Sequence, residues 1–590
     1  MQITQTIGLI FLGGLILNVS CCGKKDDGDK NDVTGVAVGS GELVSWVSGA
    51  EDLVLSPKGA AAGQQYIAMP FATGDSATVV GAGAENLTLT VKKGAALTRR
   101  NASAFLTTDG PSAWQEEDHL RRTALNRFDS QKGAGQDSGF WSAIRRLDRL
   151  GTMESRRLER AFRRLGAQSP RPEMRAATAT DCPDSEVVMP RFSDASTPAN
   201  ISVDVGTSFN GTDYCLAVVD GTDLVSESDL ATIKSSLTEV MRRYKSVIYA
   251  DNFSANTKDG YSFKPLIIIA DFSDASIWPD ANATDPDLRA INEVYQVAGV
   301  FLSDMTTALK RPVLYMASDL ARVKGAEGTS AEIARKTFHA TLAHEMQHVI
   351  MDYYRRRGAS DAPETTFLDE GIAHYMEDLF GYGEVSFEGF PKVFLTSLLD
   401  GTSPFLGADE DSKIQRGAAQ TLIYYLVSQK GGVKFNDGTF EAGEGINALA
   451  KVVKGTSTIG ARSLAAAFAA GDAAAWTSTV GGYLGALVLD GTTVVSSDAR
   501  YTVQVPVEGV RDLQGNSNKS FGMRFNGFGG LSDRLGAYTQ STDGDLTSDG
   551  KTLKNYQTVP VLWTVAKTGD SLGASFSDSA GRYLQFVRVK

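Results

Sequence analysis

The chain of 590 residues is short of histidine, of cysteine and of basic charge. With a formal net charge of −12, it lacks the excess of lysine and arginine that binds a phosphate backbone, so nucleic acid is not expected as a partner. No apolar stretch has the ~20 residues that a membrane-spanning helix needs. The apolar fraction of 42% is nevertheless that of a globular protein with real cores, so several packed domains are expected.

The N-terminus has the pattern of an export signal. The apolar run Ile7 to Val19 is too short to cross a bilayer, and it ends just before Cys21, Cys22 and a charged stretch. This pattern resembles a bacterial lipoprotein cleavage site, which implies that Cys21 is lipidated and anchors the mature chain to a membrane of the cell envelope or outer surface. Processing at Cys22, or simple secretion without a lipid, is the alternative.

The other two cysteines are Cys182 and Cys215. In an exported protein an even pair favours a disulfide over a metal site or a nucleophile. Closing a loop of this length would stabilise the fold by about 3 to 4 kcal/mol in the chain-entropy estimate. Two unrelated buried thiols are the alternative.

Composition divides the chain into segments. The arginine-rich part has apolar residues at helical spacing and is interpreted as a solvated amphipathic helix pair, with a removable pro-segment or a patch for anionic surfaces as alternatives. The expected order is a signal peptide at 1–20, a flexible tether at 21–40, a small β domain at 41–108, the Arg-rich helical segment at 109–180, a mixed module at 181–480 and a C-terminal β-sandwich at 481–590.

Strands and helices are mixed within 181–480. Lys264–Phe272 is a continuous apolar run, as in a strand covered on both faces. We expect a helix over Asp285–Leu309, a strand over Arg311–Ser318 that Pro312 places at a sheet edge, and a long helix from about Ser330 to Arg357. This order predicts a multidomain α+β protein.

Three of the five histidines lie in that long helix, and two of them form His344-Glu345-Met346-Gln347-His348. Residues four apart on a helix lie one above the other, so His344 and His348 can bind one metal ion while Glu345 reaches a water beside it. His339 lies roughly 140° round the helix from His344 and is a poor ligand. An apolar stripe on the opposite face is expected to pack into the module: Leu342, Met346, Val349 and Tyr353.

A third protein ligand is needed, and the next helix offers one. Basic residues and Gly358 end the first helix, and Thr365 or Thr366 caps the second. Its apolar face leaves Glu370, His374 and Glu377 on the other side. If the second helix folds back antiparallel to the first, Glu370 reaches the metal.

The two histidines, followed by Glu370-Gly371-x-Ala373-x-Tyr375-x-Glu377, resemble the gluzincin superfamily of zinc metallopeptidases, and most of all the hyicolysin-type neutral metallopeptidases of bacteria. The resemblance implies a zincin-like metallopeptidase module, a mixed sheet plus active-site helices, flanked by the two β domains. It also implies Zn²⁺ as cofactor, a peptide or protein substrate, His344, His348 and Glu370 as zinc ligands and Glu345 as general base. Asp369 and Glu377 are expected to contact the ligating histidines.

The sequence leaves the transition-state donor and the substrate-binding strand open. Family members stabilise the transition state with a Tyr or His, and the candidates here are His374, Tyr382, Tyr424 and Tyr425. An extended substrate is expected beside an edge strand, for which Arg311–Ser318 is the candidate.

The competing interpretation is a surface lipoprotein adhesin or binding protein whose metallopeptidase module is incidental or inactive.

Overall fold

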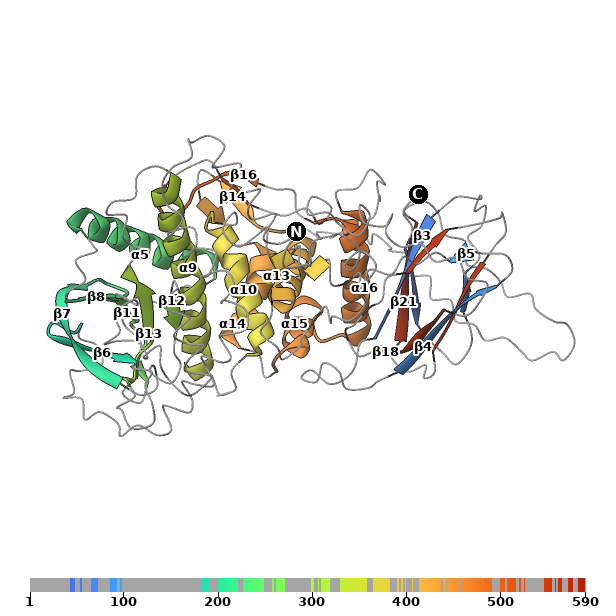
Figure 1. Cartoon of the computed structure of the whole chain (residues 1–590), viewed down its shortest axis with the longest axis horizontal. Helices are drawn as coiled ribbons and strands as arrows, with labels where there is room; N and C mark the ends of the chain where they lie inside the picture. The colour runs from blue at the N-terminus through green and yellow to red at the C-terminus, as the bar shows by residue number, and fades with distance from the viewer. Residues whose placement is uncertain are drawn as a thin grey trace, which may run out of the picture.

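The computed structural model describes the strands within residues 43–97 and, with gaps, residues 182–588; the longest gaps are 271–298 and 526–545. The predicted signal peptide, Cys21, the tether and the segment 109–180 lie outside the described residues. The protein is mixed α+β, with a six-stranded sheet, a group of helices and two further β sheets following one another along the long axis (Figure 1). Among the described helices, none combines the length and the apolar character needed to span a bilayer.

The six-stranded sheet has the order β12-β13-β11-β8-β7-β6 and is mixed, because β11 pairs in parallel with β8 and β13 while the other pairs are antiparallel. Every residue of β8, β11 and β13 is buried, as expected for an apolar run covered on both faces. The strands are β6 (Glu186–Pro190), β7 (Asn200–Asn210), β8 (Cys215–Val219), β11 (Leu266–Ala270), β12 (Gly299–Phe301) and β13 (Val313–Ala317). Cys182 and Cys215 form a disulfide with a Cα–Cα distance of 5.3 Å.

The edge of this sheet differs from the prediction. Strand β13 is internal, between β11 and β12, so the predicted edge position of Arg311–Ser318 is wrong. Pro312 precedes the strand, and its carbonyl accepts a hydrogen bond from Leu266 N at 2.8 Å. The edge strand is β12, which lies inside the segment predicted to be helical. Its pairing is a tertiary contact that the helical spacing of the sequence does not reveal.

The helices stack beside the sheet. Helix α9 (Thr329–Arg357) packs against β12 and β13, and α10 (Thr366–Leu379) lies between α9 and α13 (Lys413–Gln429). The other helical elements whose bounds the structure describes are α5 (Glu227–Val247), α14 (Glu444–Lys454), α15 (Ala461–Phe468), α16 (Ala473–Leu489) and the 3-10 turn η2 (Ala499–Tyr501). Short hairpins are β9 (Thr257–Lys258) with β10 (Tyr261–Ser262), β14 (Lys434–Asn436) with β15 (Thr439–Glu441), and β16 (Val507–Val510) with β17 (Lys519–Phe521).

The strands at the two ends of the chain form one β unit. One sheet has the order β1-β21-β3-β19-β5 and the other β18-β4-β20-β2, so each combines N-terminal and C-terminal strands (Figure 1). This differs from the two separate flanking domains that we expected, and the expected boundary at 480 falls inside α16. The strands are β1 (Leu43–Val47), β2 (Leu53–Leu55), β3 (Gln65–Ala72), β4 (Glu85–Lys92), β5 (Ala96–Leu97), β18 (Leu546–Leu553), β19 (Val561–Thr564), β20 (Ser571–Phe576) and β21 (Arg582–Arg588).

Gly371 allows α10 and α13 to approach closely. A Cβ at this position would lie 3.1 Å from the Ala419 Cα and closer still to the Ala419 side chain. We therefore expect Gly371→Val to force the two helices apart and to lower the free energy of unfolding by about 1 to 3 kcal/mol. Urea denaturation checks this, with Ala474→Val on the exposed start of α16 as the control. Equal stability of the two variants would contradict the close approach.

Candidate metal centre

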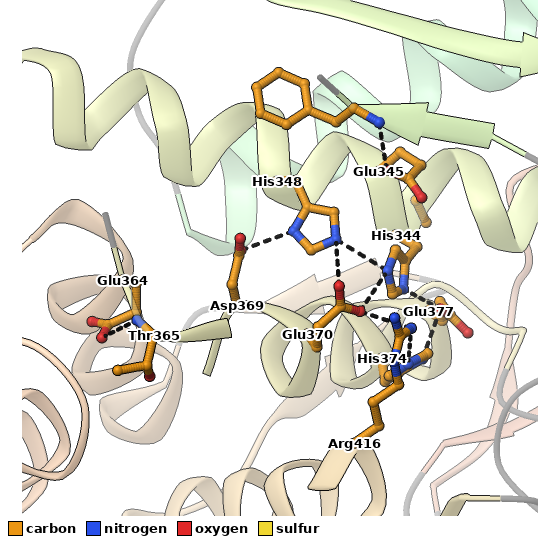
Figure 2. Close-up of polar contacts among 12 residues, drawn as sticks. His344, Glu345, His348, Glu364, Thr365, Asp369, Glu370, His374, Glu377 and Arg416 are labelled. Atoms are coloured by element: carbon orange, nitrogen blue, oxygen red, sulfur yellow. Dashed lines mark hydrogen bonds and ion pairs between the residues drawn. The ribbon is translucent and has the colours of Figure 1, made fainter. Parts of the chain in front are cut away.

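Helix α9 carries the histidine pair on one face and the core on the other. The predicted stripe of Leu342, Met346, Val349 and Tyr353 is buried, with at most 2% of any side chain exposed. On the other face the Nε2 atoms of His344 and His348 lie 3.1 Å apart (Figure 2). The helical spacing of the sequence therefore places both imidazoles at one point.

Helix α10 brings a carboxylate to the same point. Glu370 Oε2 lies 3.3 Å from His344 Nε2, and Glu370 Oε1 lies 3.8 Å from His348 Nε2. Donor atoms 2.0 to 2.2 Å from one tetrahedral ion lie roughly 3.3 to 3.6 Å apart. The three side chains thus have about the mutual spacing of donors around a single ion, and the antiparallel fold-back expected from the sequence is present (Figure 2).

The start of α10 is fixed by a buried carboxylate. Thr365 caps the helix without a side-chain hydrogen bond. Instead Glu364 accepts hydrogen bonds from Thr365 N at 2.9 Å and Gly460 N at 2.6 Å, and pairs with Arg355 at 2.5 Å. Because Arg355 belongs to the last turn of α9, this cluster ties the two helices together just before Glu370.

Each histidine also has a carboxylate at its other ring nitrogen. His344 Nδ1 lies 2.5 Å from Glu377 Oε1, and His348 Nδ1 lies 2.9 Å from Asp369 Oδ1 (Figure 2). With the protons on Nδ1, both Nε2 lone pairs face the shared centre, as in metal sites where a carboxylate orients the ligating imidazole. Donor type and orientation therefore fit a divalent cation, and Glu377 and Asp369 occupy the places predicted for them.

His344 belongs to two groups of side chains whose donor atoms are close enough to hold a metal ion. Its ligand atoms lie within 4.8 Å of those of Glu345 and His348 in one group, and of His374 and Glu377 in another. Together with the distances to Glu370, these groups mark the facing surfaces of α9 and α10 as a site that could hold a metal ion.

The electrostatics of the centre favour positive charge. Burial alone would lower the pKa of His348, but Asp369 outweighs it, with help from Glu370, and raises that pKa to about 9. Burial likewise opposes the charge on His344, yet Glu370 and Glu377 raise its pKa well above the ordinary value. A metal ion that binds here would displace protons that these carboxylates otherwise stabilise.

Glu345 lies beside the histidines and reaches the sheet edge. Its Oε2 accepts a hydrogen bond of 2.9 Å from Phe301 N in β12 (Figure 2). The side chain keeps some exposure, but the surrounding protein excludes enough water to raise its pKa, an effect partly offset by His344 and His348. A carboxylate with a raised pKa accepts a proton more readily, which suits general acid–base chemistry.

Arg416 of α13 is the residue of this cluster that the sequence analysis missed. It is 8% exposed, and its Nη1 lies 2.8 Å from Glu370 Oε2 and donates to His374 Nε2 at 3.2 Å. Burial alone would raise the pKa of Glu370, but Arg416 and the imidazoles hold it well below the ordinary value. The sequence feature that could have pointed to Arg416 is its position as a charged residue near the start of α13, a largely apolar helix.

His374 is buried rather than facing solvent. Only 4% of it is exposed, and its Nδ1 lies 2.9 Å from Glu377 Oε1. Burial is the main cause that lowers its pKa. Since both ring nitrogens contact Glu377 and Arg416, His374 lies within the layer that supports the predicted ligands.

The predicted tyrosines are directed elsewhere. After α10 the chain turns at Gly381, whose φ is +93°, and Tyr382 then accepts a hydrogen bond from Leu513 N at 3.0 Å. Tyr425 donates to Arg500 O at 2.9 Å, and the Tyr424 ring packs on Tyr375 with centroids 4.9 Å apart. The Tyr382 hydroxyl is thus engaged by Leu513 N, and its proposed role at the centre is not supported.

His339 also lies away from the centre, as its helical angle predicts. It is 2% exposed, and its ring stacks on Tyr382 with centroids 6.2 Å apart.

Comparison of the chain with models of known protein families finds no match, and comparison with curated proteins finds no significant match either. Any functional conclusion therefore has to come from the chemistry of the centre.

Proposed function

We propose that this chain is a zinc-dependent endopeptidase of the gluzincin type, with a zincin-like module formed by the six-stranded sheet and helices α9 and α10. The observation that carries the proposal is the convergence of His344 Nε2, His348 Nε2 and the Glu370 carboxylate, with Glu345 beside them. Two imidazoles and one carboxylate form a ligand set that catalytic zinc sites use.

Each of the four residues has a distinct role in the proposal. His344, His348 and Glu370 would hold the ion, which when bound supplies Lewis acidity, lowering the pKa of a coordinated water to about 7 and polarising the peptide carbonyl. Phe301 N engages Oε2 of Glu345, so Oε1 is the oxygen that takes the proton from the attacking water. Glu345 then delivers that proton to the leaving amine as the C–N bond breaks, and no covalent bond to the enzyme forms.

Substrate binding is proposed at β12. This strand is the sheet edge nearest the centre, and its Phe301 already contacts Glu345. An extended peptide can add to such an edge through main-chain hydrogen bonds. We therefore propose β12, and not Arg311–Ser318, as the edge strand that binds the substrate.

The biological setting is part of the same proposal. The N-terminal pattern supports an exported bacterial protein whose lipid at Cys21 anchors it in the cell envelope. Nitrogen and carboxylate donors favour zinc over magnesium or calcium, which prefer oxygen donors alone. The substrate class is a peptide or protein outside the cytoplasm.

An internally quenched peptide blocked at both ends tests the proposal. The full chain should hydrolyse it with zinc present, lose that activity in a chelator, and regain it when Zn²⁺ is returned. The melting temperature measured in the same samples separates loss of the ion from unfolding. Absence of hydrolysis by folded, zinc-loaded protein would favour the adhesin or binding protein with an inactive module.

A further inference from the structure

The support of the centre is a closed ring of polar contacts. His344 Nδ1 contacts Glu377, Glu377 contacts His374, His374 accepts from Arg416, Arg416 pairs with Glu370, and Glu370 returns to His344 Nε2 (Figure 2). We refer to His344, Glu377, His374, Arg416 and Glu370 as the polar ring. It links both nitrogens of one predicted ligand to the carboxylate of another.

Arg416 is the member that comes from a third helix. The other four lie on α9 and α10, whereas Arg416 lies on α13. All five are buried, with between 4% and 8% exposed. Water therefore cannot readily replace a missing contact, and removal of one partner leaves the others without compensation.

Both contacts of Arg416 come from one nitrogen of its planar guanidinium. A single nitrogen, Nη1, lies 2.8 Å from Glu370 Oε2 and 3.2 Å from His374 Nε2. A guanidinium is planar and always charged, so its orientation carries over to both partners, whereas an ammonium is a compact charge with no fixed plane. Glu377 faces the other nitrogen of His374 and so fixes the plane of that ring.

We propose that Arg416, oriented by His374, is a positioning residue for the metal centre: it holds the Glu370 carboxylate in the orientation that an ion requires. The inference rests on the proposed function, since it takes Glu370 as a ligand. It adds that ligand geometry is set from α13, through a contact that the sequence motif does not contain.

Metal affinity and a spectroscopic signature test the proposal in the full chain. In Arg416→Gln, zinc affinity measured by competition with a chromophoric chelator should fall about 10- to 100-fold, the usual effect of removing a partner of a ligand. The visible absorption of the Co²⁺-loaded variant should also change in intensity or position, because the ligand field changes. Arg416→Lys, which keeps the charge, should recover part of the affinity but not the wild-type spectrum.

The matched control is another buried arginine outside the ring. Arg311 is 5% exposed and donates to Lys264 O, so Arg311→Gln should lower stability without changing the affinity or spectrum of the folded fraction. If Arg416→Gln does not fold, Arg416→Lys and His374→Gln carry the test, each with weakened zinc binding and an altered Co²⁺ spectrum expected.

The outcomes separate this inference from the proposed function. Wild-type protein that binds no zinc and cleaves no peptide overturns the proposed function. Wild-type protein that binds and cleaves, together with folded Arg416 variants that match its affinity within twofold and reproduce its spectrum, overturns the positioning role alone. Weakened binding with an unchanged spectrum also overturns it, because altered ligand geometry is what the proposal requires.

Discussion

Glu345→Gln should lower kcat for a blocked peptide by about 10²- to 10⁴-fold, the range in which general acid–base catalysis contributes. Glutamine keeps the shape of the side chain but cannot take a proton from water at neutral pH. The amide can still lie near Phe301 N, which contacts Glu345 Oε2 at 2.9 Å, so the fold should change little. Steady-state kinetics of zinc-loaded protein measure the effect.

Two controls make this result specific. The zinc content of Glu345→Gln should equal that of wild type, because Glu345 is not one of the three proposed ligands. Glu444→Gln, the same change at an exposed position in the first turn of α14, should leave kcat unchanged. Activity of Glu345→Gln within a few-fold of wild type would remove the proposed base from the mechanism.

Glu370→Ala should have the second large effect, the loss of tight zinc binding together with peptide hydrolysis. The change removes the third donor, so the fall in affinity should exceed the ~100-fold expected for a residue that only supports a ligand. It also leaves Arg416 buried without its carboxylate, a loss that typically costs about 3 to 5 kcal/mol. Zinc titration and urea denaturation of the same protein measure the two effects separately.

The conservative variant keeps this prediction testable if the alanine protein is too unstable. Glu370→Gln retains the shape and an oxygen donor but lacks the charge, so it should bind zinc more weakly than wild type while unfolding at a higher urea concentration than Glu370→Ala. Stoichiometric, tight zinc binding by both variants would show that Glu370 is not the third ligand.

The features that the sequence predicted well are local ones. Four-residue spacing and an apolar stripe placed His344 and His348 on one face of α9. Helix-ending signals gave the end of α9, and a capping signal gave the start of α10. Glu377 followed from the same periodicity, whereas Asp369 was expected only as a partner of a ligating histidine. In each case the interaction that determines the structure joins residues of one helix or of two consecutive helices. A short stretch of sequence is therefore enough to predict it.

The features that the sequence did not predict depend on distant pairing. Arg416 reaches Glu370 where α13 packs closely on α10 beside Gly371, and neither the spacing nor the composition of the sequence predicts that packing. The edge strand β12 has three residues and pairs with β13 across an intervening segment. Alternating apolar and polar residues likewise identified strands at both ends of the chain but gave no information on their partners.

The interleaved β unit constrains the order in which the chain can complete its fold. Among the described strands, β1 to β5 have ladder partners only within β18 to β21. During synthesis β1 to β5 leave the ribosome before β18 to β21, so their edges stay open until those later strands are made. The six-stranded sheet and the helices between them can assemble in the meantime. A stop codon shortly before Leu546 would thus remove every described ladder partner of the N-terminal strands, although it leaves the residues of the candidate metal centre in the product.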